Sequence, residues 1–249
     1  VRKKAFEVLE ENDFLFRNLL RTGQAFRPQL REVASKWPDF LNGILPRMST
    51  IFQLSVLRHH ASGDLFVLAN THLFYHPLAR HIRLLQVFCL LHQVQELRLK
   101  HCQGGKLPHV VFAGDLNCLP DTGAVQLMLE GEVSSDHPDW ENWSQFAWRE
   151  EDVEVEDDDG ETKLQTSTAP SLEADEADVV ELLEKEEWQK GCGVSLQNPL
   201  GCLVDTYAAE HLAFTNYVSD FNGVLDYILV SDSLRSAKCL PVPSEEDLL

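Results

Sequence analysis

The sequence predicts an α/β domain, and three features of the chain support this prediction. Ile51–Leu57 and Leu65–Ala69 have the composition of two strands, joined by a polar turn in which Gly63 reverses the chain. A long amphipathic helical pattern follows over Ala79–Lys100, and a short apolar segment rich in β-branched residues, His109–Ala113, comes after it. Strands that alternate with a helix in this way are typical of α/β folds.

The segments before the hairpin give weaker patterns. Ala5–Leu9 fits either a strand or the start of a helix, because its apolar period does not decide. Apolar residues from Phe14 to Leu20 fit one helical stripe that ends near Gly23, and Leu30–Trp37 predicts a short helix before Pro38.

Shorter elements are predicted after the apolar strand. Gly123–Leu129 has the pattern of a helix with Thr122 as its N-cap, and Ser134–Trp148 has the composition of a loop. Farther along, a hairpin is expected in which Ala213–Tyr217 and Val224–Val230 are the strands. Val218–Gly223 would be its turn.

The acidic charge of the chain is concentrated in one segment. The net charge is −19, and Glu150–Glu187 contains 17 acidic residues against two lysines. With few large apolar residues, most of this segment is expected to be a disordered insertion in a surface loop. The remainder is only mildly acidic, so the net charge does not exclude a nucleic-acid substrate.

The cysteines and the apolar segments favour an intracellular protein. The six cysteines are scattered and have no zinc-site spacing, which favours a reducing compartment. The longest apolar run, Leu84–Val94, contains glutamines and a histidine and is too short to span a bilayer. The chain starts at Val1 with no signal-like segment, which is expected for a fragment or a processed chain.

Polar residues follow the apolar strand directly. Gly114 allows the backbone to turn sharply, and Asp115 and Asn117, two residues apart, share one face in extended backbone. A carboxylate and a carboxamide on one rim can hold a hard cation, a water molecule and a phosphate oxygen. The same residues fit a purely structural Asx turn, so spacing alone leaves both interpretations open.

Other predicted strands also end in polar residues. Asn70 and His72 follow the second strand of the first hairpin, and Asn216 and Asp226 belong to the last hairpin. Because sites in α/β proteins collect where loops leave strand ends, these residues are candidates for a common site. A carboxylate inside an apolar strand, as expected for Asp226, is costly unless it is paired or hydrogen-bonded.

The first turns of the long helix are basic. Arg80, His81 and Arg83 place positive charge near the positive end of the helix dipole, which is locally unfavourable. These residues could serve solubility, or they could contact an anionic ligand.

Taken as an ordered set, the motifs resemble one known family. NTHL at Asn70–Leu73, GDLN at Gly114–Asn117, TNY at Thr215–Tyr217 and LDYIL at Leu225–Leu229 resemble the endonuclease/exonuclease/phosphatase family, which has the DNase I-like fold. The longer stretches NTHLFYHP, SSDHPDW and FTNYVSDFNGVLDYI are similar to its 2′,5′-phosphodiesterase 12-like branch, which is related to the CCR4-type deadenylases.

The resemblance implies a DNase I-like two-layer β-sandwich flanked by helices. The chain would be a partial domain over residues 1–249, apparently truncated at both ends, with 150–187 as an insertion. The family's metal-binding Glu would precede this chain, and its closing Ser-Asp-His is not found; Ser231-Asp232-Ser233 lacks the histidine.

The resemblance also implies roles for four catalytic residues and a metal. Asp115 would be the general base, or would orient the attacking water, near Mg²⁺, for which it is a possible ligand. Asn117 would hold the phosphate and that water, and His72 would stabilise charge on the phosphoryl oxygens. Asp226 would orient the family's terminal histidine.

Four further residues would bind substrate. Asn70 is assigned to substrate binding, and Asn216 would contact phosphate. Pro77 and Phe221 would sandwich an adenine base, which suits base stacking on flat apolar surfaces.

The function implied by the resemblance is magnesium-dependent hydrolysis of adenylate-rich RNA, both 2′,5′-oligoadenylate and poly(A), to 5′-AMP by in-line attack of water. It also suggests the mitochondrial matrix. Two alternatives stay open: a truncated or degenerate non-catalytic paralogue that acts as a binding protein, and a family member with another substrate, such as a DNA-repair endonuclease or an inositol-phosphate phosphatase.

Overall fold

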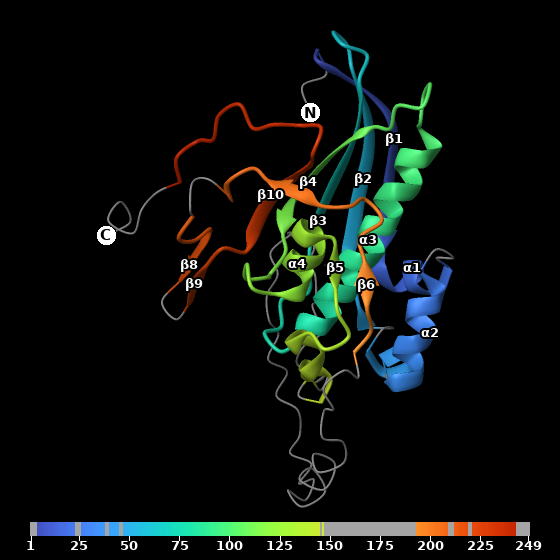
Figure 1. Ribbon diagram of the computed structural model, residues 1–249, viewed down its shortest axis with the longest axis vertical. Coiled ribbons are helices and arrows are strands. Elements are labelled where there is room, and N and C mark those ends of the chain that lie inside the picture. Colours follow the sequence, from blue (N-terminus) through green and yellow to red (C-terminus); the bar gives the residue numbers. More distant parts are fainter. Residues whose placement is uncertain are drawn as a thin grey trace, which may run out of the picture.

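The computed structural model describes residues 4–22, 26–37, 40–44, 47–144, 146, 193–208, 212–218 and 221–242. Its centre is a six-stranded sheet (Figure 1). The strands follow in the order β1 (Phe6–Leu15), β2 (Ile51–His59), β3 (Leu65–His72), β4 (His109–Asp115), β10 (Asp226–Ser231) and β7 (Leu203–Asp205). The long helix α3 (Arg80–Lys100) runs along this sheet. The predicted acidic insertion at 150–187 lies outside the described residues.

The N-terminal segment begins with a strand rather than a helix. β1 (Phe6–Leu15) pairs antiparallel with β2, and α1 (Phe16–Thr22) starts only where this pairing ends. The predicted helical stripe was therefore wrong for its first two residues, because pairing with β2 overrides a weak local helical pattern. The predicted second helix is confirmed as α2 (Arg27–Lys36), and a short π-helical turn, η1 (Phe40–Ile44), follows.

The predicted first hairpin is confirmed and is longer than expected. It consists of β2 (Ile51–His59) and β3 (Leu65–His72), and Gly63 in the connection has a positive φ of 75°. β4 (His109–Asp115) confirms the predicted apolar strand and runs parallel to β3. β10 (Asp226–Ser231) lies antiparallel to β4, and the short β7 (Leu203–Asp205) closes the sheet.

The long predicted helix is confirmed as α3 (Arg80–Lys100), but it is not amphipathic over its first three turns. Every residue from His81 to Leu91 is buried, because the sheet, α1, α4 and the 3₁₀ turn η3 all pack around this part of the helix. A helix buried on all sides need not show an apolar stripe. In the part of the chain that the structure describes, no helix is long and apolar enough to cross a membrane.

The predicted helix after β4 is confirmed as α4 (Gly123–Glu130). Thr122 occupies the N-cap position, but its hydroxyl donates to the Leu119 carbonyl and makes no cap bond. Instead the buried Asp139 accepts the Gly123 N–H at 2.7 Å. Asp139 belongs to η3 (Pro138–Ser144), so the prediction of a loop was wrong there.

The remaining strands are short. β5 (Glu132–Val133) pairs with β6 (Leu196–Gln197), and β8 (Asn216–Val218) pairs with β9 (Phe221–Gly223). The pairing predicted for the last hairpin was therefore wrong. β8 pairs with Phe221–Gly223, which was expected in the turn, whereas the strand expected over Val224–Val230 is β10 and pairs with β4 and β7. The strong apolar strand begins only at Asp226.

Side chains alternate between two faces of the sheet, as strand geometry requires. The inner face is buried together with α3 in the hydrophobic core and includes Phe52, Leu54, Val67, Phe112 and Leu229. The opposite face, called the outer face below, carries exposed or half-buried side chains, among them Asn70, His72, Val111, Asp115, Asp226 and Ile228. The sequence-predicted polar residues of three strands therefore share one face and one end of the sheet.

Gly114 is required by a close approach of two strands rather than by a turn. It pairs with Thr71 across the parallel β3–β4 ladder, and a Cβ at this position would lie 2.1 Å from the Thr71 carbonyl oxygen. Backbone atoms of a central strand cannot move aside easily, so there is no room for a side chain.

We expect Gly114→Ala to lower the free energy of unfolding by about 2 kcal/mol or more, in the upper range for overpacking a tight site. Urea denaturation followed by circular dichroism measures this. Gly43→Ala is the matched control, because a Cβ there would have no atom within 4 Å. Equal stability of the two variants would contradict the account of the β3–β4 contact.

Glu10 on β1 accepts from Lys100 at 2.7 Å and lies 2.6 Å from His101 Nε2, both at the end of α3. Hydrogen bonds from Lys100 and then His101 lower the pKa of Glu10 to about 2. A carboxyl whose pKa is lower in the folded than in the unfolded protein stabilises the fold at pH values above its unfolded-state pKa. This stabilisation is lost as the pH falls toward 2. We expect Glu10→Gln to cost no more than about 1 kcal/mol at pH 7, the range for exposed ion pairs, and nothing near pH 2.

Urea denaturation at a series of pH values tests this expectation. Glu11→Gln is the control, since Glu11 forms no ion pair with any described residue. A Glu10→Gln effect that is constant between pH 2 and pH 7 would refute the ionic explanation.

Candidate active site

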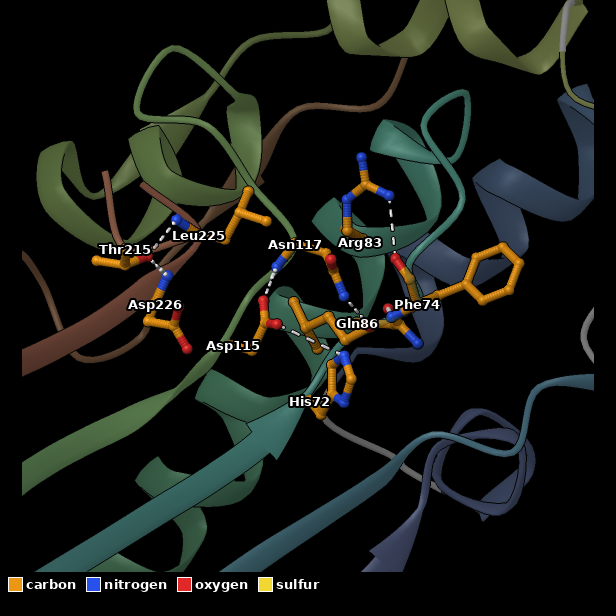
Figure 2. Close-up of polar contacts among 10 residues, drawn as sticks. His72, Phe74, Arg83, Gln86, Asp115, Asn117, Thr215, Leu225 and Asp226 are labelled. Carbon is orange, nitrogen blue, oxygen red and sulfur yellow. Dashed lines mark hydrogen bonds and ion pairs between the residues drawn. The ribbon is translucent and has the colours of Figure 1, made fainter. Parts of the chain in front are cut away.

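Three neighbouring strands bring His72, Asp115 and Asp226 together. In the sheet register, His72 lies opposite Asp115 across β3–β4, and Asp115 lies opposite Asp226 across β4–β10. Figure 2 shows Asp115 between the other two side chains. His72 Nε2 is 3.6 Å from Asp115 Oδ2. Two carboxylates and an imidazole therefore share the C-terminal end of β4 on the outer face.

The Asx turn considered at Asp115 is present. Asp115 Oδ1 accepts the Asn117 backbone N–H at 2.8 Å, and Asn117 has a positive φ of 49°. Asn117 Nδ2 donates to the Leu73 carbonyl at 2.8 Å, while the Leu73 N–H donates to the Asp115 carbonyl at 3.0 Å. The turn leaves Asp115 Oδ2 on the His72 side. The structural and the chemical interpretations of this motif are therefore compatible.

The charges around Asp115 oppose one another. Burial raises the pKa of the Asp115 carboxyl, whereas the Asn117 N–H and the His72 imidazole lower it, and the negative charge of Asp226 raises it again. His72 is far more exposed, with 71% of its side chain accessible against 28% for Asp115. The site thus presents an accessible imidazole beside a half-buried carboxylate.

Asp226 is held by a residue that the site prediction did not include. Thr215 Oγ1 accepts the backbone N–H groups of Leu225 and Asp226 at 2.9 and 3.0 Å (Figure 2), and the Leu225 carbonyl accepts the Leu116 N–H. Thr215 is the first residue of the TNY motif, and this motif could have identified it from the sequence. The predicted burial cost for Asp226 was wrong, because this residue is exposed at the first position of β10.

A cavity of about 340 Å³ lies beside Asp226. Its lining includes Gly114, Tyr207, Thr215, Asp226 and Ile228. Of the predicted site residues, Asp226 belongs to this lining, whereas His72 and Asp115 do not.

The predicted substrate-binding residues come from different parts of the fold. Asn70 is exposed on the outer face two residues before His72, and its amide donates to Gln53 Oε1 at 3.0 Å. Pro77 is exposed on the loop between β3 and α3, whereas Asn216 and Phe221 lie on the β8–β9 hairpin. A Cβ at Gly223 would touch both Leu119 and the Phe221 ring, so the hairpin packs against the loop that follows Asn117.

The basic start of α3 does not face a ligand. His81 is fully buried with its ring 4.2 Å from that of Trp143, and burial lowers its pKa well below the usual value. Arg83 is buried against backbone carbonyls, and Arg80 lies 3.7 Å from the buried Asp139. The hypothesis that these residues contact an anionic ligand was therefore wrong for His81 and Arg83. Arg83 instead donates to the backbone of the loop that follows His72 (Figure 2).

The donor set suits a hard cation only in part. Among the described residues, no group of three or more His, Cys, Asp and Glu side chains is arranged to hold a metal ion. Asp115 and the opposed Asp226 do supply carboxylate oxygens whose mutual repulsion a cation would relieve. Mg²⁺ is commonly held by one or two carboxylates together with substrate phosphates and waters. Asp115 and Asp226 therefore supply part of the ligand set of such a site.

Comparison with known proteins gives sequence relatives over nearly the whole chain. The chain is 28% identical over 249 residues to 2′,5′-phosphodiesterase 12 of Rattus norvegicus and 27% identical to that of Homo sapiens, covering 99% of this chain in both cases. It is 20% identical over 220 residues to a CCR4-Not complex 3′-5′-exoribonuclease subunit Ccr4 of Aspergillus niger, over 80% of the chain. The chain spans about a third of the length of the two 2′,5′-phosphodiesterase 12 relatives and 27% of the length of the Ccr4 subunit. No protein-family model matches it.

A solved structure shares the fold. The crystal structure of ANGEL2, a 2′,3′-cyclic phosphatase, in complex with adenosine-2′,3′-vanadate, superposes with a TM-score of 0.54 at 18% identity, covering 92% of this chain and 57% of ANGEL2. The predicted DNase I-like fold class is confirmed. The predicted resemblance to the 2′,5′-phosphodiesterase 12-like proteins and to the CCR4-type deadenylases is therefore confirmed at the level of sequence similarity.

Proposed function

We propose that the protein containing this chain is a metal-dependent phosphodiesterase that hydrolyses adenylate-containing RNA, both 2′,5′-oligoadenylate and poly(A), to 5′-AMP. The observation that carries the proposal is the convergence of His72, Asp115 and Asp226 at one end of the outer face. The relatives named for 2′,5′-phosphodiesterase and 3′-5′-exoribonuclease activity support the same reaction class.

Each residue has a role that its surroundings allow. Asp115 accepts the proton of the attacking water, or orients it, since burial raises its pKa toward the range of a general base. His72 is exposed beside it and donates to the phosphoryl oxygens as charge develops there. Asn117 is fixed by Leu73 and holds the water or the phosphate. Asp226, exposed at the first position of β10, would orient the terminal histidine that the family resemblance implies.

Magnesium fits this assignment. Asp115 would hold it, with substrate phosphate oxygens completing the coordination. A bound Mg²⁺ would neutralise phosphate charge and polarise the P–O bond. For the compartment, we propose the mitochondrial matrix on the family resemblance alone.

Removal of the Asp115 carboxylate should abolish most of the turnover. In the full-length protein we expect Asp115→Asn to lower kcat for 2′,5′-oligoadenylate by about 10²-fold or more, the usual contribution of a general base. Chelation with EDTA should stop the wild-type reaction, and added Mg²⁺ should restore it. Chromatographic measurement of 5′-AMP release follows both changes.

Asp64→Asn is the control, because Asp64 lies in the first hairpin turn and pairs with Lys106. Full turnover by Asp115→Asn, or hydrolysis that persists in EDTA, would contradict the proposed mechanism.

The assignment of Phe221 to the adenine base predicts selectivity. Stacking of a base on an aromatic ring is worth about 1–3 kcal/mol, so Phe221→Ala should raise KM for oligoadenylate by about tenfold. Steady-state kinetics are measured with oligoadenylate and with an oligouridylate, whose bases stack more weakly. Val218→Ala is the matched control, since Val218 is the exposed partner of Phe221 across the hairpin. Equal KM changes in both variants would remove Phe221 from the adenine site.

A further inference from the structure

The loop between β3 and α3 connects two residues of the proposed site, His72 and Pro77. It leaves the sheet directly after His72 and places Pro77 on the surface before α3 begins. Over Leu73–Leu78 it has no helix or strand of its own. Its geometry therefore depends on what its backbone groups bond to, because a buried backbone polar group needs a partner.

Two residues of α3, one turn apart, supply four of these bonds. Arg83 Nη1 donates to the carbonyls of Phe74 at 3.0 Å and His76 at 2.6 Å, and Arg83 Nη2 approaches the Pro77 carbonyl at 3.5 Å. Gln86 Oε1 accepts the Phe74 N–H at 3.2 Å. Figure 2 shows Arg83 and Gln86 on either side of the Phe74 backbone.

Burial of the Arg83 side chain at this position is energetically unfavourable. Arg83 is only 3% exposed, and it forms no ion pair with any described carboxylate within 4 Å. Its Nε has no hydrogen-bond partner among the described residues. Burial raises the pKa of the Asp115 and Asp139 carboxyls, and the Arg83 charge acts on both without a direct ion pair and lowers these pKa values. A buried charge that is not directly paired is unfavourable, and an apolar side chain would pack on this buried helix at lower cost. Simple packing therefore does not account for the guanidinium.

The guanidinium can bond to several carbonyls at once, which a side chain with a single donor group does less well. Its planar fork donates in fixed directions and so holds carbonyls of residues 74, 76 and 77 at the same time. A lysine ammonium at the same position is a compact point donor and would hold fewer of them in one geometry.

We propose that Arg83 is a positioning residue for substrate recognition: it fixes the 73–78 loop so that Pro77 is presented to an adenine base. This inference rests on the proposed function and extends it to a residue that touches neither phosphate nor base. The effect of losing Arg83 should therefore fall on adenylate binding rather than on the chemical step.

The test uses the full-length protein with Arg83→Lys, Arg83→Met and the control Arg98→Lys. Arg98 lies near the other end of α3 and donates from Nε to the Pro108 carbonyl at 2.9 Å, so it is also a guanidinium bonded to a backbone carbonyl. For Arg83→Lys we expect KM for 2′,5′-oligoadenylate to rise about tenfold, the scale of one lost base contact, with kcat within about threefold of wild type. Arg98→Lys should leave both constants unchanged.

A double-mutant cycle identifies the route of the effect. If Arg83 acts through Pro77, the KM changes of Arg83→Lys and Pro77→Gly should be strongly non-additive, because residues in one network couple. Arg83→Lys remains informative if Arg83→Met does not fold. Additive effects, an unchanged KM, or a loss confined to kcat would overturn the inference.

A binding measurement separates this inference from the proposed function. Fluorescence polarisation with labelled oligoadenylate, on an Asp115→Asn background, reports affinity without hydrolysis. If the wild type does not hydrolyse oligoadenylate but Arg83→Lys still weakens binding about tenfold, the positioning role stands and the proposed reaction fails. If oligoadenylate does not bind at all, both proposals fail.

Discussion

The parallel contact between β3 and β4 is the constraint on which the site depends. Gly114 has no room for a Cβ because the Thr71 backbone lies against it, and this contact sets the register of the two strands. With that register, His72 lies opposite Asp115 and both side chains point to the outer face. A slip by one residue would turn every side chain of a strand to the other face and separate the two groups. The packing at Gly114 therefore also fixes the relative positions of His72 and Asp115.

A second layer of bonds turns this strand end into a defined site. Asn117 and Leu73 connect the chain after β4 to the chain after β3, and Thr215 connects the β8–β9 region to the start of β10. Backbone groups that leave a sheet need new partners, and here the partners belong to neighbouring strand ends. Hydrogen bonds therefore connect the segments that carry the candidate residues, and these segments are not independent loops.

The long helix contributes through polar groups as well as apolar ones. Its first turns are buried on all sides, yet they contain His81, Arg83 and Gln86. His81 packs on Trp143, whereas Arg83 and Gln86 bond to the loop beyond His72. Charge near a helix start and polar residues in a core are both unfavourable in isolation. Here they accompany a loop that has no regular structure to satisfy its own backbone.

The sequence alone determined the α/β class, the first hairpin, the long helix, the strand at His109 and the polar residues at strand ends. Those features depend on local periodicity and turn chemistry, which a single sequence displays. Only the tertiary structure decided that Phe14 and Leu15 extend a strand, that Phe221 pairs in β9, and that Asp226 is exposed, because these outcomes depend on pairing with distant segments. The direction of Arg83, inward to carbonyls rather than outward to a ligand, was likewise decided by the packing around α3. A charge pattern gives the residue type, but the surrounding elements determine which groups it meets.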